Sequence, residues 1–305
     1  SFMEEFWKIY PGWASNRGYH KYDSLLVVPN EASRVKESAF CQAYLDSLKT
    51  FDLSTLSNNN KIDHRLIENQ LRATLWSNGE LKTYEWNPSE YNVSGGFAEM
   101  LNNNYDSLDV RVYHCYVRMA AIPAYYEAAK INIKNPTVEH TQLAMDQNTG
   151  GLSVFEKDFP NALKKTHFSD KEKQAMSVRA SESVKAIKDY VAWLKKLENK
   201  TPHSFRLGKE LYAKKFEFDI QSGYTVDQIY DRAVAHKKEL HEKMTQIADQ
   251  LWPKYFGTLP KPADKLKLIK QVLDTLSVHH VKPDSFQTAI ERQIPVLIEF
   301  VKQKK

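Results

Sequence analysis

The stretch Thr225–Trp252 has the plainest helical pattern in the chain and constrains the fold most strongly. Thr225 precedes Gln228 by three residues, which is the spacing of a capping box at a helix start. Apolar residues then recur at the intervals of one helix face: Val226, Ile229, Tyr230, Ala233, Leu240, Met244, Ile247, Ala248, Leu251 and Trp252. Such a helix spans roughly 40 Å. We therefore expect a large helical body to cover its stripe and Pro253 to end it.

The rest of the chain favours helices as well. Ten Gly and 12 Pro among 305 residues are few for a turn-rich β protein. Apolar stripes predict helices over 31–51, 63–76, 109–132, 169–197 and 265–276, with a loop at Asn58–Asn60 and a last helix opening at Pro283. Pro123 should kink or divide the third of these helices. We therefore predict an all-α, multi-helix lobe over 1–305, with 1–165 and 166–305 as an alternative division.

Charge and composition exclude several classes of protein. The net charge of +5 is spread among 43 basic and 38 acidic residues, so no electrostatic footprint for nucleic acid is seen. No apolar run approaches the length of a membrane span, and no signal-peptide core is present. Cys41 and Cys115 are too few for a disulfide framework, and we interpret them as two independent buried thiols.

Two polar segments outside the helices are candidates for a binding surface. Tyr19–Asp23 could form a polar patch at the mouth of a cleft, or a surface loop in which Asp23 caps the next element. The segment 77–98 contains Trp86, Asn87 and a Gly pair. It could present aromatic and amide groups to a ligand, or it could be a packed loop whose Trp belongs to the core.

Two groups of residues in predicted helices also have two possible roles each. Arg111, His114 and Arg118 lie on neighbouring turns and could form a carboxylate clamp, because Arg presents a bidentate fork. Such Arg residues more often pair with Glu or Asp on an adjacent helix. The pair Gly150–Gly151 could end a helix, or it could permit close packing against a neighbour.

The residues alone give no complete active site. The nearest approach to the zinc-binding pattern His-Glu-x-x-His is His241–Thr245, where Thr occupies the second ligand position. His236 and His241 are five residues apart and do not share a helix face. There is no nucleophile elbow and no phosphate-binding glycine loop. We therefore predict no catalytic residue, no metal ligand and no cofactor for this segment.

Four segments, in order along the chain, resemble a bacterial family known as domain of unknown function 885. Gly18–Asp23 (GYHKYD) is similar to an early Gly-x-His-x-Tyr-Asp segment of the family, and Trp86–Tyr91 (WNPSEY) to an Asn-Pro-x-x-Tyr turn. Arg118–Pro123 is similar to its Pro-kinked central helix, and Gly208–Phe216 to its middle portion. The resemblance covers essentially the whole chain.

The resemblance implies an N-terminal portion of a protein about twice as long. Family members resemble cleft-forming helical zinc metallopeptidases whose His-Glu metal segment lies in the C-terminal half. The chain would then be the substrate-side lobe of a metallopeptidase-like hydrolase, with that half as its partner, a peptide-like substrate and zinc in the full-length protein. Many relatives are exported, so the resemblance implies a periplasmic or lipoprotein-anchored bacterial protein. A non-catalytic helical binding or scaffold module is the alternative. The candidate substrate contacts are His20, Tyr22, Asp23, Trp86, Asn87 and Tyr91.

Overall fold

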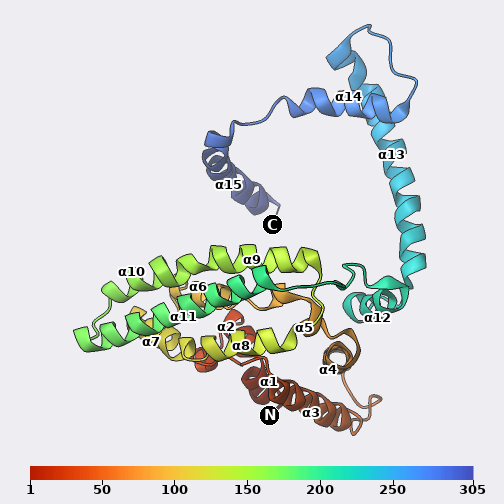
Figure 1. Ribbon diagram of the computed structural model, residues 1–305. Helices are drawn as coiled ribbons and strands as arrows, with labels where there is room; N and C mark the ends of the chain where they lie inside the picture. Colours follow the sequence, from red (N-terminus) through yellow and green to blue (C-terminus); the bar gives the residue numbers. More distant parts are fainter. Residues whose placement is uncertain (305) are drawn as a thin grey trace. The chain divides into compact units, whose positions relative to one another are not determined.

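The computed structural model describes residues 1–304, and all regular structure in them is helical (Figure 1). This confirms the predicted all-α class. The chain divides into two compact units, Ser1–Gln221 and Ser222–Lys305. The alternative boundary at 165/166 lies inside the first unit, where the helix that follows it packs against several earlier helices. The description of 1–305 as a single lobe stays a prediction.

The first unit holds most of the helices. Short helices begin it and form its connections: α1 (Phe2–Ile9), α2 (Pro11–Asn16), η1 (His20–Tyr22), η2 (Ser77–Leu81), α5 (Thr83–Trp86), η3 (Pro88–Glu90), η4 (Val154–Asp158) and α10 (Phe159–Lys164). The longer helices are α3 (Glu31–Leu48), α4 (Asn58–Trp76), α6 (Ser94–Asn102), α7 (Leu108–Met119), α8 (Ile122–Asn132), α9 (Val138–Ser153), α11 (Asp170–Lys196) and α12 (Gly208–Ile220).

Local sequence signals account for several helix boundaries. Ser169 and Glu172 form the predicted capping box of α11. Pro123 divides the predicted helix over 109–132 into α7 and α8, because Pro is tolerated in the first turn of a helix but not in its interior. The loop predicted at Asn58–Asn60 is wrong. Those residues form the first turn of α4, because the Ser57 hydroxyl accepts the backbone N–H of Asn60 and caps the helix.

The main core of the first unit lies where α11 packs against α7, α8 and α9, which run beside one another in Figure 1. Its largest fully buried side chains include Phe97, Tyr126, Phe159 and Tyr190. The Tyr126 hydroxyl donates to Oδ1 of the buried Asn148 at 2.6 Å, so this polar group is satisfied inside the core. A smaller core joins α1, α3 and α4. Both cysteines are free and buried, as predicted.

The close approach of α6 and α9 explains the Gly150–Gly151 pair. Helix α9 continues through both residues and does not end there. A Cβ added at Gly151 would lie 2.3 Å from the Oγ of Ser94 in α6, whereas one added at Gly150 would meet nothing within 4 Å. Of the two predicted roles, close packing against a neighbour is therefore confirmed, and Gly151 is the residue that permits it.

The second unit consists of α13 (Val226–Phe256), α14 (Lys265–Ser277), η5 (Pro283–Ser285) and α15 (Phe286–Gln303). The capping box of Thr225 and Gln228 is confirmed. The prediction that Pro253 ends the helix is wrong, because α13 continues to Phe256. Pro253 cannot donate to the carbonyl of Asp249, and the ammonium of Lys261 donates to that oxygen instead, at 3.2 Å.

The stripe of α13 is only partly covered. Ala248 and Trp252 pack against α14, as the stripe predicts. Nearer the start of the helix, Tyr230 is 69% exposed and Val234 50% exposed. Within the second unit, no described element covers the first half of α13. Helix α15 likewise buries none of its residues, although it is rich in apolar side chains.

Gly151→Ala should destabilise the first unit, because the new methyl group would overlap the Ser94 side chain. The expected loss is about 1–3 kcal/mol in the free energy of unfolding, the usual range for overpacking. Gly150→Ala is the matched control and should stabilise the same helix by about 0.5–1 kcal/mol. Urea unfolding followed by circular dichroism would measure both. Equal effects of the two substitutions would contradict the close contact between α6 and α9.

Candidate functional site

The most elaborate polar arrangement in the first unit surrounds the carboxylate of Asp23. Asp23 is completely buried. Its Oδ1 accepts a hydrogen bond from the Ser15 hydroxyl at 2.5 Å, and its Oδ2 accepts one from the Tyr105 hydroxyl at 2.5 Å. Nδ1 of His20 lies 3.0 Å from Oδ2. A carboxylate removed from water needs such donors, since an unpaired buried charge is costly. We call Ser15, His20, Asp23 and Tyr105 the Asp23 centre.

Three separate parts of the chain build the Asp23 centre. Ser15 lies in α2, His20 begins the single-turn helix η1, and Tyr105 lies in the connection between α6 and α7. The rings of His20 and Tyr105 stack with centroids 3.4 Å apart and planes 4° from parallel. Burial, and then the hydrogen bond to Asp23, raise the pKa of the Tyr105 hydroxyl, so it stays protonated and continues to donate.

The Asp23 centre fixes the orientation of the His20 imidazole. An ionised carboxylate only accepts, so the contact with Asp23 places a proton on Nδ1 of His20. Nε2 then points away from Asp23 and has no partner among residues 1–304, while the side chain as a whole is 28% exposed. His114 approaches the same carboxylate from α7, but its Nδ1 is 3.9 Å from Oδ2, beyond hydrogen-bond distance.

Of the two interpretations of Tyr19–Asp23, the surface loop with a capping Asp is wrong. Asp23 is buried, both of its oxygens accept side-chain donors, and α3 is capped by Asn30 instead. Tyr22 has a different environment from its neighbours His20 and Asp23. Its hydroxyl donates to Glu4 at 2.5 Å, beside Tyr19 and Lys21, which donate to the same carboxylate. The Tyr22 side chain therefore links η1 to α1 through a hydrogen bond.

The other three predicted site residues make contacts that stabilise the loop in which they lie. The indole of Trp86 donates to the carbonyl of Leu81 at 2.8 Å and stacks on His203. The amide oxygen of Asn87 caps η3 through the N–H of Ser89. The hydroxyl of the buried Tyr91 donates to the carbonyl of Tyr84 at 2.7 Å. These contacts match the packed-loop interpretation, and a role in substrate contact for these residues stays a prediction.

The two arginines of α7 differ sharply. Arg111 donates to the backbone carbonyls of Met100, Leu101 and Asp106 and so caps the end of α6. Arg118 is 7% exposed, and its Nε and Nη1 atoms have no hydrogen-bond partner among residues 1–304. Within the described part of the chain, neither arginine forms an ion pair with Glu or Asp. Such a pair is the commoner of the two alternatives predicted from the sequence.

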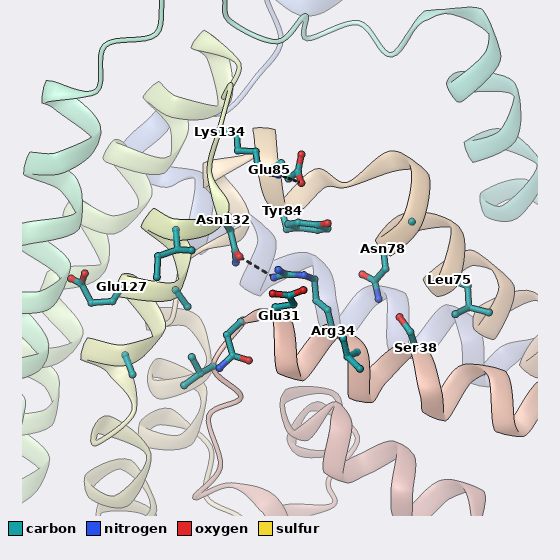
Figure 2. A pocket seen from close by; sticks show the side chains of 17 residues that line it. Glu31, Arg34, Ser38, Leu75, Asn78, Tyr84, Glu85, Glu127, Asn132 and Lys134 are labelled. Carbon is teal, nitrogen blue, oxygen red and sulfur yellow. Dashed lines mark hydrogen bonds and ion pairs between the residues drawn. The ribbon is translucent and has the colours of Figure 1, made fainter.

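A cleft of about 840 Å³ lies elsewhere in the first unit (Figure 2). Arg34 crosses it, with its guanidinium 4.1 Å from the centre of the Tyr84 ring and a hydrogen bond of 3.0 Å to Oδ1 of Asn132. At its rim, Lys134 pairs with Glu85 at 2.6 Å. Arg34, Lys134 and Glu85 are therefore engaged with other residues of the cleft, and none of the six predicted site residues lines it.

Metal-ligand residues do not gather in the part of the chain that the structure describes. Between Ser1 and Lys304, no group of three or more His, Cys, Asp or Glu is placed to hold a metal ion. His236 makes a contact of 3.4 Å with Glu239, and His241 lines a shallow hollow of the second unit. The zinc that the family resemblance implies therefore finds no fitting ligand set among these residues. No helix of residues 1–304 is long and apolar enough to span a membrane.

The fold and the site define a class: an all-α protein with a buried Asp–His–Tyr centre in its larger unit. The family of bacterial proteins of unknown function named domain of unknown function 885 matches residues 11–305, so the chain belongs to this family. This confirms the resemblance. No curated protein matches the chain.

One solved structure is similar over almost the whole chain. It is described as "a putative lipoprotein of unknown function from Shewanella oneidensis". The two chains share 44% sequence identity with a TM-score of 0.87, and the match covers 99% of this chain. It covers 56% of the other chain, so the present sequence spans little more than half the length of that protein.

Glu4→Gln should make the Tm of the protein less dependent on pH at acidic pH. Hydrogen bonds from Lys21, Tyr22 and Tyr19 lower the pKa of Glu4 from 4.5 to about 2. Because the folded pKa is depressed, the stabilisation is complete above pH 4.5 and is lost as the pH falls towards 2. The Tm difference between wild type and Glu4→Gln should therefore shrink over this interval. Glu210→Gln is the control, since Glu210 is exposed and has no polar partner in residues 1–304. A constant Tm difference between pH 2 and 6 would contradict the Glu4 contacts.

Proposed function

We propose that this chain forms the substrate-side lobe of a larger, metallopeptidase-like hydrolase that acts on peptides or related amides. The observation that carries the proposal is the Asp23 centre. It holds the imidazole of His20 in one tautomer and one plane, with the second ring nitrogen left for a ligand. A fixed and partly exposed imidazole is suited to orienting a polar substrate.

The Asp23 centre would act on substrate through hydrogen bonding. With Nδ1–H of His20 donating to Asp23, Nε2 accepts a hydrogen bond from an N–H of the substrate. When the ring is protonated, Nε2 donates instead, for example to a carbonyl oxygen. Stacking on Tyr105 restricts rotation of the ring, so the bound substrate is held in one orientation. Holding reacting groups in place contributes substantially to enzymatic rates.

The remainder of the hydrolase would lie outside this chain. The match to 56% of the Shewanella lipoprotein supports a longer protein, and the exposed apolar faces of α13 and α15 offer surfaces for its other half. Residues of that half would hold zinc, which polarises a scissile carbonyl and activates water. The description of that relative as a lipoprotein supports an extracytoplasmic location, in the periplasm or anchored to a membrane by lipid.

A non-catalytic helical binding or scaffold module is the second candidate. The same exposed apolar faces favour it, because contiguous apolar surface marks a site of protein interaction. The two proposals differ in what they require of the Asp23 centre. Only the hydrolase needs His20 and Asp23 for turnover of a substrate.

Asp23→Asn and His20→Gln should each lower kcat/KM for peptide hydrolysis by about 100-fold in the full-length protein, because the imidazole loses its fixed position. Zinc content, measured by atomic absorption, should not change. Asp109→Asn is the matched control. Asp109 pairs with His167 at the same 3.0 Å, but His167 is 92% exposed, so this substitution should leave kcat/KM unchanged.

Two results would contradict the proposal, the first the hydrolase activity and the second the role of the Asp23 centre in it. One is stoichiometric zinc in the full-length protein without hydrolysis of any peptide in a mixed-sequence library, which would favour the binding module. The other is hydrolysis at the wild-type rate after both substitutions at the Asp23 centre. A loss of zinc on substitution of His20 would show that this residue is a ligand and not an orienting group.

A further inference from the structure

Arg118 is a buried cation without a counter-charge in contact. It lies on α7 and is 7% exposed, and its Nε and Nη1 atoms are fully buried without a hydrogen-bond partner in residues 1–304. The guanidinium carbon stands 5.4 Å from the centre of the Phe97 ring. Burial lowers the pKa of Arg118, since the charged form is poorly solvated there. An unpaired buried guanidinium is costly, so its presence points to an anion that completes it.

Helix α6 contributes a second feature that favours an anion. Gly96 is the third residue of this nine-residue helix, and a Cβ added there would lie 3.1 Å from Nη2 of Arg118. The guanidinium therefore packs against the first turn of α6. The N–H groups of a first turn lack partners inside the helix and carry the positive end of its dipole. Gly96 is itself only partly buried, so this side of the guanidinium lies close to the surface.

The surroundings of Arg118 connect it with the Asp23 centre. His114 is one turn earlier on the same helix, with a buried Nδ1 that has no hydrogen-bond partner in the described residues. That atom lies 3.9 Å from the carboxylate of Asp23, which also accepts from His20. Arg118 and His20 thus belong to one polar region of the first unit.

We propose that Arg118 binds a carboxylate group of the ligand. The planar guanidinium offers parallel N–H donors, which match a carboxylate in a bidentate pair. Resting on the function proposed above, the ligand is a peptide-like molecule with a free terminal carboxylate. Arg118 holds that group while His20 contacts the amide nearby. A carboxylate supplied by another part of the longer protein would have the same chemistry, and the experiment separates the two sources.

The experiment measures equilibrium binding of N-acetylalanine and N-acetylalanine amide to the full-length protein by calorimetry. The carboxylate should bind about 10- to 100-fold more tightly than the amide, the range expected for hydrogen bonds to a charged group. Arg118→Met should abolish this preference. It should also raise the Tm of the ligand-free protein, because an unpaired buried charge is replaced by an apolar side chain of similar length.

Two glycine variants keep the proposal testable if Arg118→Met fails to fold. Gly96→Ala places a methyl group against Nη2 of Arg118 and should weaken binding of N-acetylalanine about tenfold. Gly95→Ala is the matched control, since a Cβ there meets nothing within 4 Å, and it should leave binding unchanged. Both positions are helical, so Ala should not reduce the stability of α6.

Equal binding of the carboxylate and the amide to wild type would overturn the proposal. So would a lower Tm of Arg118→Met together with no carboxylate preference in wild type, because a carboxylate of the protein itself would then pair with Arg118. The readout is binding and not turnover. A carboxylate preference in a protein that hydrolyses no peptide would uphold Arg118 as a binding residue and reject only the hydrolase.

Discussion

The buried carboxylate of Asp23 is the constraint on which the candidate site depends. A charge with no access to water must be satisfied by the protein, and here two donors from the N-terminal helices and one from the distant Tyr105 converge on it. The connection before α7 must reach α2 and η1 to bring Tyr105 to Asp23. The carboxylate thus joins the N-terminal helices to the main core, and the same contacts set the plane of the His20 ring.

This constraint separates the Asp23 centre from other polar contacts of the chain. Asp109 and His167 make a contact of the same length, but at the surface, where water competes for both groups. Arg34 and Asn132 line the cleft of about 840 Å³ and are hydrogen-bonded to each other. Around Asp23 and Arg118, by contrast, His20, His114 and Arg118 keep ring or guanidinium nitrogens that the described residues do not use.

Local features of the fold could be predicted from the sequence, and long-range ones could not. The capping boxes at Ser169 and Thr225 and the division at Pro123 depend on neighbouring residues, so the sequence contains all the information needed. Helix α13 continues past Pro253, and the donor that Pro253 lacks is supplied by Lys261, which lies beyond the helix. No pattern around Pro253 indicates that contact.

The same difference between local and long-range contacts applies to the candidate site. The family resemblance identified His20 and Asp23, but Ser15 and Tyr105 escaped prediction, because Tyr105 is 82 residues away and belongs to no recognisable motif. Trp86 and Asn87 have the composition of a binding loop, yet their polar atoms form hydrogen bonds with nearby backbone groups.

The most direct test of the role of Asp23 is the ¹⁵N NMR spectrum of the His20 imidazole in the full-length protein at neutral pH. A proton on Nδ1, hydrogen-bonded to a carboxylate, is the predicted result. A neutral ring with its proton on Nε2 and a bare Nδ1 would contradict the claim that Asp23 orients His20.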